Sequence, residues 1–143
     1  MKGYWNNEEE TKNAITSDGW FKTGDIGIMT ESGYPKIVDR KKDMIIISGF
    51  NVYPNEIEEV AMMHEKIFEA GCIGINNNDG TESIKLFVSL LSGEILTIQE
   101  IHEHCKKNLT GYKVPKNIEF IDEIPKSNVG KILRRELRGR ESA

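Results

Sequence analysis

From residue 44 onward the amino-acid sequence predicts an α+β fold with the order strand, helix, two strands, helix, strand. Three observations support this prediction. The apolar, largely β-branched run from Met44 to Ile47 is typical of a strand covered on both faces. Pro54 stands where a first helical residue is expected, and acidic residues follow it in the early turns. Thr97 precedes Glu100 by three residues, which is the capping-box pattern that begins a second helix.

The residues before this domain predict short strands and tight turns. Residues 1–17 contain polar clusters and no sustained hydrophobic period. Beyond them, glycine-containing turns separate two strand candidates, Ile26 to Met29 and Tyr34 to Asp39. The charged run from Asp39 to Asp43 indicates a junction between two parts of the chain. We therefore expect a chain that begins partway through one domain and continues into a second.

The remaining elements follow from hydrophobic period and turn residues. The strands expected after residue 49 are Phe50 to Tyr53, Ala70 to Ile75, Ile84 to Leu91 and Asn117 to Ile121. The first helix is expected to carry one stripe made of Ile57, Val60, Ala61 and His64. The second is expected to face inward with Ile98, Ile101, Cys105 and Leu109 and to close at Gly111. A short arginine-rich helix is expected from Ile132 to Leu137.

Charge and composition exclude several classes of function. The net charge is −4 and both signs are mixed along the chain, so a nucleic-acid partner is not expected. Cys72 and Cys105 form no C-x-x-C pair, which favours a reducing, cytoplasmic setting. His102 and His104 lie two apart on a predicted helix and point to different faces, so no metal site is expected. No apolar run approaches the roughly 18 to 20 residues of a membrane helix. Peripheral contact with the inner face of a membrane stays open.

The segment Lys126 to Lys131 is the most informative candidate for chemistry, because two lysines and a glycine occupy a polar loop ahead of a short helix. It departs from a P-loop, since Pro125 replaces the first glycine and Ile132 replaces the magnesium-binding Ser or Thr. A solvated surface lysine is the default interpretation. The alternative is that Lys131 supplies a mobile positive charge to a phosphate group.

Two glycine-containing segments leave similar alternatives open. Asp25 in Thr23-Gly24-Asp25 is either a local hydrogen-bonding residue of a turn or a carboxylate that accepts two ribose hydroxyls. Gly49 marks either a bulge or a close approach of the backbone to another group.

Four segments in order resemble the adenylate-forming superfamily, and especially its fatty acyl-CoA synthetases. They are Gly19 to Asp25, Val38 to Asp43, Ser48 to Glu58 and Pro125 to Lys131. The resemblance runs from about Gly3 to about Leu137, and it reverses the default interpretations above. It implies that residues 1–39 are the incomplete tail of a large N-terminal domain. Residues 40–143 would form a small mobile lid, with a short mixed or antiparallel sheet flanked by helices.

The resemblance also implies a role for each candidate residue. Asp25 matches the aspartate that binds the ribose hydroxyls of ATP and acyl-AMP, and Arg40 matches an arginine that helps hold the same nucleotide. Lys42 matches the hinge about which the lid pivots between an adenylating and a thioester-forming pose. Lys131 matches the catalytic lysine of the first pose. Gly49 matches a strand that helps line the coenzyme A path in the second.

The implied activity is ATP-dependent ligation of a fatty acid to coenzyme A through an acyl-adenylate, with Mg²⁺ required in the intact enzyme. Because the phosphate loop, adenine pocket, metal-binding acid and acyl tunnel of the family are absent, we expect a truncated fragment. It should be inactive without its N-terminal domain and bind no cofactor alone. Three related enzymes stay open as alternatives: an aryl-CoA ligase, a luciferase-like oxidase and a peptide-synthetase adenylation domain. So does a non-catalytic module that docks to a partner through Tyr4, Trp5 and Trp20.

Overall fold

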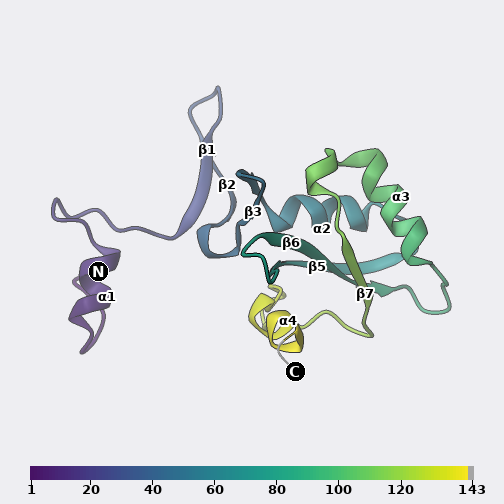
Figure 1. Cartoon of the computed structure of the whole chain (residues 1–143). Coiled ribbons are helices and arrows are strands. Elements are labelled where there is room, and N and C mark those ends of the chain that lie inside the picture. Colours follow the sequence, from purple (N-terminus) through teal and green to yellow (C-terminus); the bar gives the residue numbers. More distant parts are fainter. Residues whose placement is uncertain (142–143) are drawn as a thin grey trace. The chain divides into compact units, whose positions relative to one another are not determined.

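The computed structural model describes residues 1–141 and divides the chain into two compact units (Figure 1). The first unit contains residues 1–42 and the second begins at Asp43. A short 3-10 helix, η1 (Lys41–Asp43), spans the boundary. The two units are described separately below.

The first unit contains a helix, α1 (Glu8–Ala14), and an antiparallel hairpin made of β1 (Asp25–Met29) and β2 (Pro35–Arg40). The helix begins where the side chain of Asn7 accepts a hydrogen bond from the backbone N–H of Glu10, 3.0 Å away. None of its residues is buried. The absence of a hydrophobic period in residues 1–17 therefore gave no sign of this helix, whose signals are its polar cap and acidic first turn.

The first unit buries almost none of its apolar side chains. Asp39 is its one buried residue, and Trp5 and Trp20 are 92% and 73% exposed. Ile28, Met29, Tyr34 and Ile37 on and near the hairpin are also exposed. A monomeric domain rarely leaves so many large apolar side chains in water, so these residues form a candidate contact surface.

The second unit has a mixed three-stranded sheet of order β5-β6-β7, in which β5 and β6 are antiparallel and β6 and β7 are parallel. A separate two-stranded hairpin precedes it. The elements in order are β3 (Ile45–Ile47), β4 (Phe50–Val52), α2 (Pro54–Met62), β5 (Ile67–Asn76), β6 (Glu82–Leu90), α3 (Ile98–Asn108), η2 (Gly111–Lys113), β7 (Asn117–Phe120) and α4 (Arg134–Glu141). The predicted α+β class, with a small sheet flanked by helices, is confirmed.

The sheet of the second unit is buried on both faces, so alternate residues of each strand enter different cores. On β5 and β6, Cys72 and Leu86 belong to the core that includes residues of α2 and α3. Their neighbours Ile73 and Phe87 belong to a second core that includes Leu137 of α4. The helix α4 is therefore fixed to the face opposite α2 and α3.

The capping box of α3 is present as predicted. The hydroxyl of Thr97 accepts from the backbone N–H of Glu100, and the Glu100 carboxylate accepts from the backbone N–H of Thr97. Pro54 is likewise in the first turn of α2.

Five sequence-based expectations in this unit are wrong. Ile46 is half exposed, because β3 pairs with β4 alone and only one face of that hairpin is covered. Residue His64 lies outside α2, which ends at Met62. The side chain of Ile98 is 52% exposed, since it occupies the first turn of α3, and the helix is capped at Leu109. Finally, α4 begins at Arg134, because Ile132 instead forms a β-bridge with Lys126.

Candidate functional site

In the first unit, the β1–β2 hairpin brings Asp25 and Arg40 together at the end nearest the unit boundary. They are register partners, and Arg40 Nε lies 3.0 Å from Asp25 Oδ1. The turn before Asp25 is held by Gly24, whose φ of +74° is accessible to glycine at low cost and whose carbonyl accepts from the N–H of Lys41. The Asp25 side chain is 23% exposed. A carboxylate paired with one guanidinium and still open to water can accept further hydrogen bonds.

Lys42 is the last residue of the first unit and is exposed within η1. The next residue, Asp43, is buried within the second unit. A single turn of 3-10 helix has poor hydrogen-bond geometry, and such turns are common at points where a chain changes direction. The chain therefore passes directly from the exposed Lys42 to the buried Asp43.

Lys131 lies in a turn of the second unit that precedes α4. The turn is closed by a β-bridge between Lys126 and Ile132 and by hydrogen bonds from Ser127 N to Lys131 O and from Gly130 N to Ser127 O, both 2.8 Å. The Lys131 side chain is exposed, and within residues 1–141 no ion pair involves its Nζ atom. This lysine is presented on a structured loop and is available to an external anion.

Gly49 lies at the tip of the β3–β4 hairpin of the second unit. Because Ile47 pairs with Phe50, the loop contains only Ser48 and Gly49, with φ of +51° and +84°. Two positive φ values are the signature of a type I′ turn. The ring of Phe50 stacks on Tyr112, with ring centroids 4.9 Å apart. The hairpin tip thus has a defined shape and an aromatic support.

A buried ionic network joins α4 to the rest of the second unit, and sequence reasoning missed it. Arg134 Nη2 lies 2.9 and 2.8 Å from the two carboxylate oxygens of Glu58 and 2.6 Å from Asn55 Oδ1. Its Nε donates to the carbonyl of Cys72 at 3.2 Å. Glu58 is one of the acidic residues in the early turns after Pro54 that are expected to favour the helix N-terminus. A carboxylate three residues before the buried Ala61, on the same stripe of α2, was the available signal.

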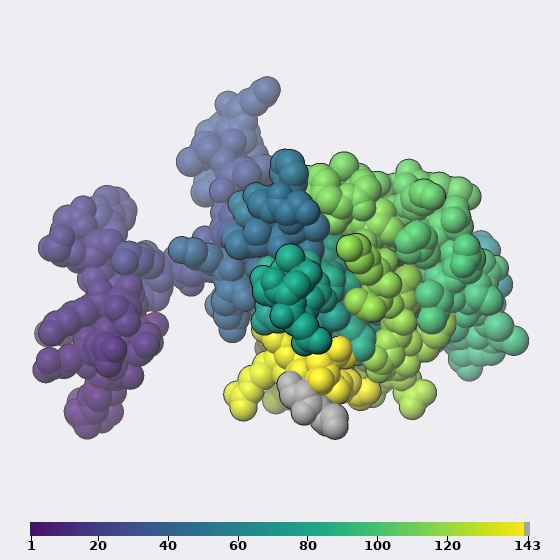
Figure 2. All heavy atoms as spheres, in the orientation of Figure 1, coloured from purple at the N-terminus to yellow at the C-terminus, as the bar shows by residue number. Residues whose placement is uncertain are grey.

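The network extends to Asp43 at the start of the unit. Arg138 Nη2 lies 2.7 Å from Asp43 Oδ1, and Arg134 Nη1 lies 3.8 Å from Asp43 Oδ2. These two arginines are one turn apart on α4, whose residues are drawn in yellow against the body of the second unit (Figure 2).

A sequence profile of the AMP-binding enzyme C-terminal domain matches residues 56–131, slightly more than half of the chain. The chain belongs to this family. The matched region runs from Glu56 on α2 to Lys131 in the turn before α4. The Asp25–Arg40 pair, Lys42 and Gly49 precede it.

Curated relatives cover the whole chain. It is 56% identical over 141 residues to the long-chain-fatty-acid–CoA ligase of Yersinia pestis and 56% identical over 143 residues to that of Haemophilus influenzae. The chain spans 25% of the length of each of these relatives.

Solved structures of the family share the fold. The crystal structure of ATP-bound MatB from Rhodopseudomonas palustris matches with a TM-score of 0.90 and 34% identity over 97% of this chain and 28% of that one. The match covers both this AMP-binding enzyme C-terminal domain and the residues before it. It uses only part of the larger solved protein.

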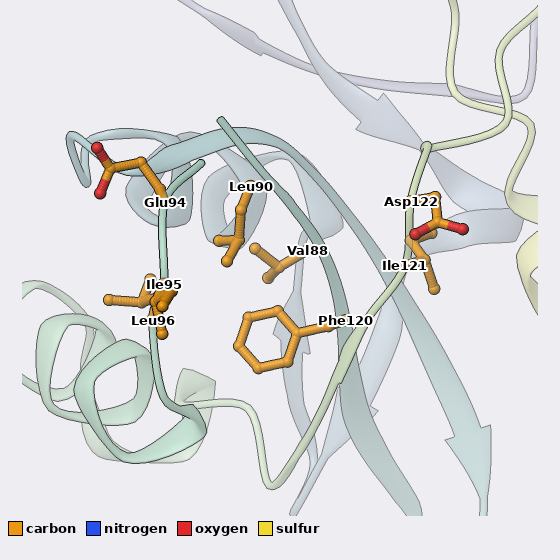
Figure 3. A pocket seen from close by; sticks show the side chains of 8 residues that line it. All are labelled: Val88, Leu90, Glu94, Ile95, Leu96, Phe120, Ile121 and Asp122. Carbon is orange, nitrogen blue, oxygen red and sulfur yellow. The ribbon is translucent and has the colours of Figure 1, made fainter. Parts of the chain in front are cut away.

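An open groove of about 430 Å³ lies at the β7 edge of the sheet in the second unit (Figure 3). The residues that line it are Val88, Leu90, Glu94, Ile95, Leu96, Phe120, Ile121 and Asp122. Asp25, Arg40, Lys42, Gly49 and Lys131 are not among them. The groove is thus no part of the candidate site.

Metal and membrane features are lacking in the described part of the chain. Over residues 1–141, no three or more His, Cys, Asp or Glu side chains gather closely enough to hold a metal ion. The helices in this range also lack the length and apolar character needed to span a bilayer.

Proposed function

We propose that this chain supplies the nucleotide-binding edge, hinge and catalytic lid of an ATP-dependent fatty acid–CoA ligase. The observation that carries the proposal is the exposed Lys131 on a structured turn of one unit, together with the Asp25–Arg40 pair on the other. High identity to curated long-chain-fatty-acid–CoA ligases supports the acyl class of the substrate.

In the first half-reaction, the fatty acid carboxylate attacks the α-phosphorus of ATP, and the bond to pyrophosphate breaks. Asp25 accepts hydrogen bonds from the ribose hydroxyls, and Arg40, which pairs with Asp25, helps to hold the same nucleotide. Lys131 brings its ammonium group to the reacting carboxylate and phosphate. There it offsets the negative charge that accumulates in the transition state. Its exposure in the turn fits a side chain that serves a site outside its own unit.

In the second half-reaction, the coenzyme A thiol attacks the acyl carbon, and AMP leaves. The second unit turns about Lys42 between the two steps, so that Lys131 departs and the Gly49 hairpin approaches the nucleotide. The tip of that hairpin presents a glycine with no side chain, which leaves room for the pantetheine arm.

Among residues 1–141, no three or more His, Cys, Asp or Glu side chains gather at one place, so this part of the chain offers no complete protein site for Mg²⁺. We assign the ligands of that metal, as well as the acyl pocket, to an N-terminal domain. The exposed aromatic and aliphatic side chains of the first unit are the surface that such a domain would cover.

We propose a cytoplasmic location, and peripheral contact with the inner face of a membrane is the alternative. Both cysteines are free and buried, which is compatible with a reducing compartment. Fractionation of cells that express the tagged chain would test the location.

Reconstitution tests the ligase activity directly. In a chimera, residues 1–143 replace the matching C-terminal quarter of the Haemophilus influenzae ligase. The expected result is long-chain acyl-CoA formation that depends on ATP and coenzyme A. The Haemophilus influenzae ligase that lacks its C-terminal quarter should be inactive by itself. A chimera that folds but forms neither acyl-AMP nor acyl-CoA would overturn the proposal. Formation of acyl-AMP without acyl-CoA would instead point to another acceptor.

A further inference from the structure

Arg134 connects the segment that carries Lys131 with the residue that follows the hinge. It lies three residues after Lys131 and is nearly buried, with a side-chain exposure of 12%. Through Asp43 the same network reaches the first residue of the second unit. Asp43 and Arg134 are far apart in the sequence. Within residues 1–141, the described side-chain hydrogen bonds and ion pairs of Asp43 are all made to arginines of α4, namely Arg134 and Arg138.

The chemistry of this network favours a rigid link. The guanidinium of Arg134 is planar, and its donors reach the Glu58 carboxylate, the Asn55 amide oxygen and the Cys72 carbonyl at the same time. Glu58 is anchored in turn, because its Oε1 accepts from the backbone N–H of Cys72 at 2.8 Å. The side chains of Glu58 and Asp43 are only 5% and 8% exposed, so water competes weakly with these bonds.

The charges of the network balance. Two arginines of α4 face two carboxylates, one on α2 and one at the end of η1. Buried ion pairs often add little net stability, and their best-supported use is to specify one geometry. A stability role alone thus leaves unexplained why four ionised groups meet between the hinge and the Lys131 turn.

We propose that Arg134 is a positioning residue, which holds the Lys131 turn at a fixed distance from the hinge at Lys42 so that turning of the second unit delivers Lys131 accurately. This inference rests on the proposed ligase function. If the link is lost, Lys131 is misplaced in the adenylating pose. The thioester-forming pose, in which Lys131 takes no part, is much less affected.

The test uses the chimeric ligase with both half-reactions measured separately. Arg134→Met alone would leave Glu58 buried without its cation and risks unfolding. The double variant Arg134→Met/Glu58→Met removes both charges and keeps similar volumes. We expect it to lower the adenylation rate roughly tenfold to a hundredfold, as for a misplaced catalytic group, and to change thioester formation from supplied acyl-AMP less than about twofold.

Lys85→Met is the matched control. Lys85 has a comparable side-chain exposure, 13%, and binds Glu119 and Glu141, so it anchors the far end of α4 without contacting Asp43 or Glu58. We expect it to affect both half-reactions equally. Parallel loss in the double variant, or no loss in either step, would overturn the positioning role.

The variant Lys131→Ala distinguishes failure of the positioning role of Arg134 from failure of the catalytic role of Lys131. If Lys131→Ala lowers adenylation selectively and the double variant does not, the positioning role of Arg134 is wrong and the ligase function stands. If Lys131→Ala also lacks the selective loss, the catalytic role of Lys131 is wrong, and the positioning role fails with it.

Discussion

Asp25 and Arg40 lie opposite each other at one end of the β1–β2 hairpin, with Arg40 Nε 3.0 Å from the Asp25 carboxylate. The pair is separated by fifteen positions in the sequence and is brought together by strand register. The carboxylate is oriented by its arginine and open to a ligand, which is the arrangement needed to accept a pair of hydroxyl groups.

Asp25→Asn should therefore weaken nucleotide binding. The amide replaces one acceptor oxygen with a donor and removes the charge, so one hydroxyl loses a charge-assisted bond worth about 1.5 to 3 kcal/mol. We expect the Kd for ATP in the chimeric ligase to rise at least tenfold by calorimetric titration. Asp18→Asn is the control, because Asp18 is exposed and its carboxylate accepts a local hydrogen bond from Thr16. Unchanged affinity in Asp25→Asn would contradict the ribose assignment.

Lys131→Ala should reduce adenylation far more than thioester formation. Removal of a cation that faces the transition state of the first step typically costs about a hundredfold or more in rate. Pyrophosphate release reports the first step, and acyl-CoA formed from supplied acyl-AMP reports the second. Lys107→Ala, at an exposed lysine on α3, should change neither. Equal losses in both steps would remove Lys131 from the catalytic role.

Lys42→Pro should slow thioester formation and leave adenylation largely intact. Proline fixes φ near −65° and restricts Lys41 as well, so the backbone loses the freedom that rotation between poses requires. Lys42→Ala keeps that freedom and should retain both rates. An overall rate in Lys42→Pro equal to that of the unsubstituted chimera would show that the chain does not turn at this residue.

Gly71→Ala should destabilise the second unit. A Cβ atom at this position on β5 would lie 2.8 Å from Leu137 Cδ1 and 3.5 Å from Ile124 Cδ1, so the Leu137 side chain would have to shift within a buried core. Overpacking of this kind costs about 1 to 3 kcal/mol of unfolding free energy, measurable by urea titration. Gly139→Ala is the control on α4. Nothing lies within 4 Å of its Cβ position, so helix propensity should make that change neutral or stabilising.

Stability should fall as the pH rises from 9 to 11 because of Cys105. Burial raises the pKa of its thiol from an ordinary value of 9.0 to about 11. Between these pH values the unfolded thiol releases its proton and the folded thiol keeps it. The unfolded state then binds fewer protons, and the free energy of unfolding decreases as pH rises. Cys105→Ala should show a smaller decrease from pH 9 to 11 by urea titration. An identical decrease in both proteins would exclude this thiol as the cause.

The candidate residues could be located from the sequence because their signals are local. The capping box of α3, Pro54 in α2 and the glycine turns each depend on a few neighbouring residues. The motifs around Asp25, Lys42 and Lys131 are likewise continuous segments. The roles of these residues remain predictions, since they concern a nucleotide and a neighbouring domain.

Other features depend on which surfaces meet. The sequence predicted β3 to be covered on both faces, whereas its pairing with β4 alone leaves Ile46 half exposed. It also gave Ile98 an inward position that the first turn of α3 does not provide. Hydrophobic period alone does not say which end of a stripe reaches the core.

By itself, the sequence determined the α+β order of strands and helices from residue 44 onward, the capping box of α3 and the segments that resemble the adenylate-forming enzymes. Only the tertiary structure decided that Arg134, Glu58 and Asp43 meet in a buried network, and that Asp25 faces Arg40. The physical reason is the separation in sequence between the residues that interact. Caps and turns are made by residues within about four positions of each other, whereas partners 76 positions apart are chosen by the packing of α4 against the sheet.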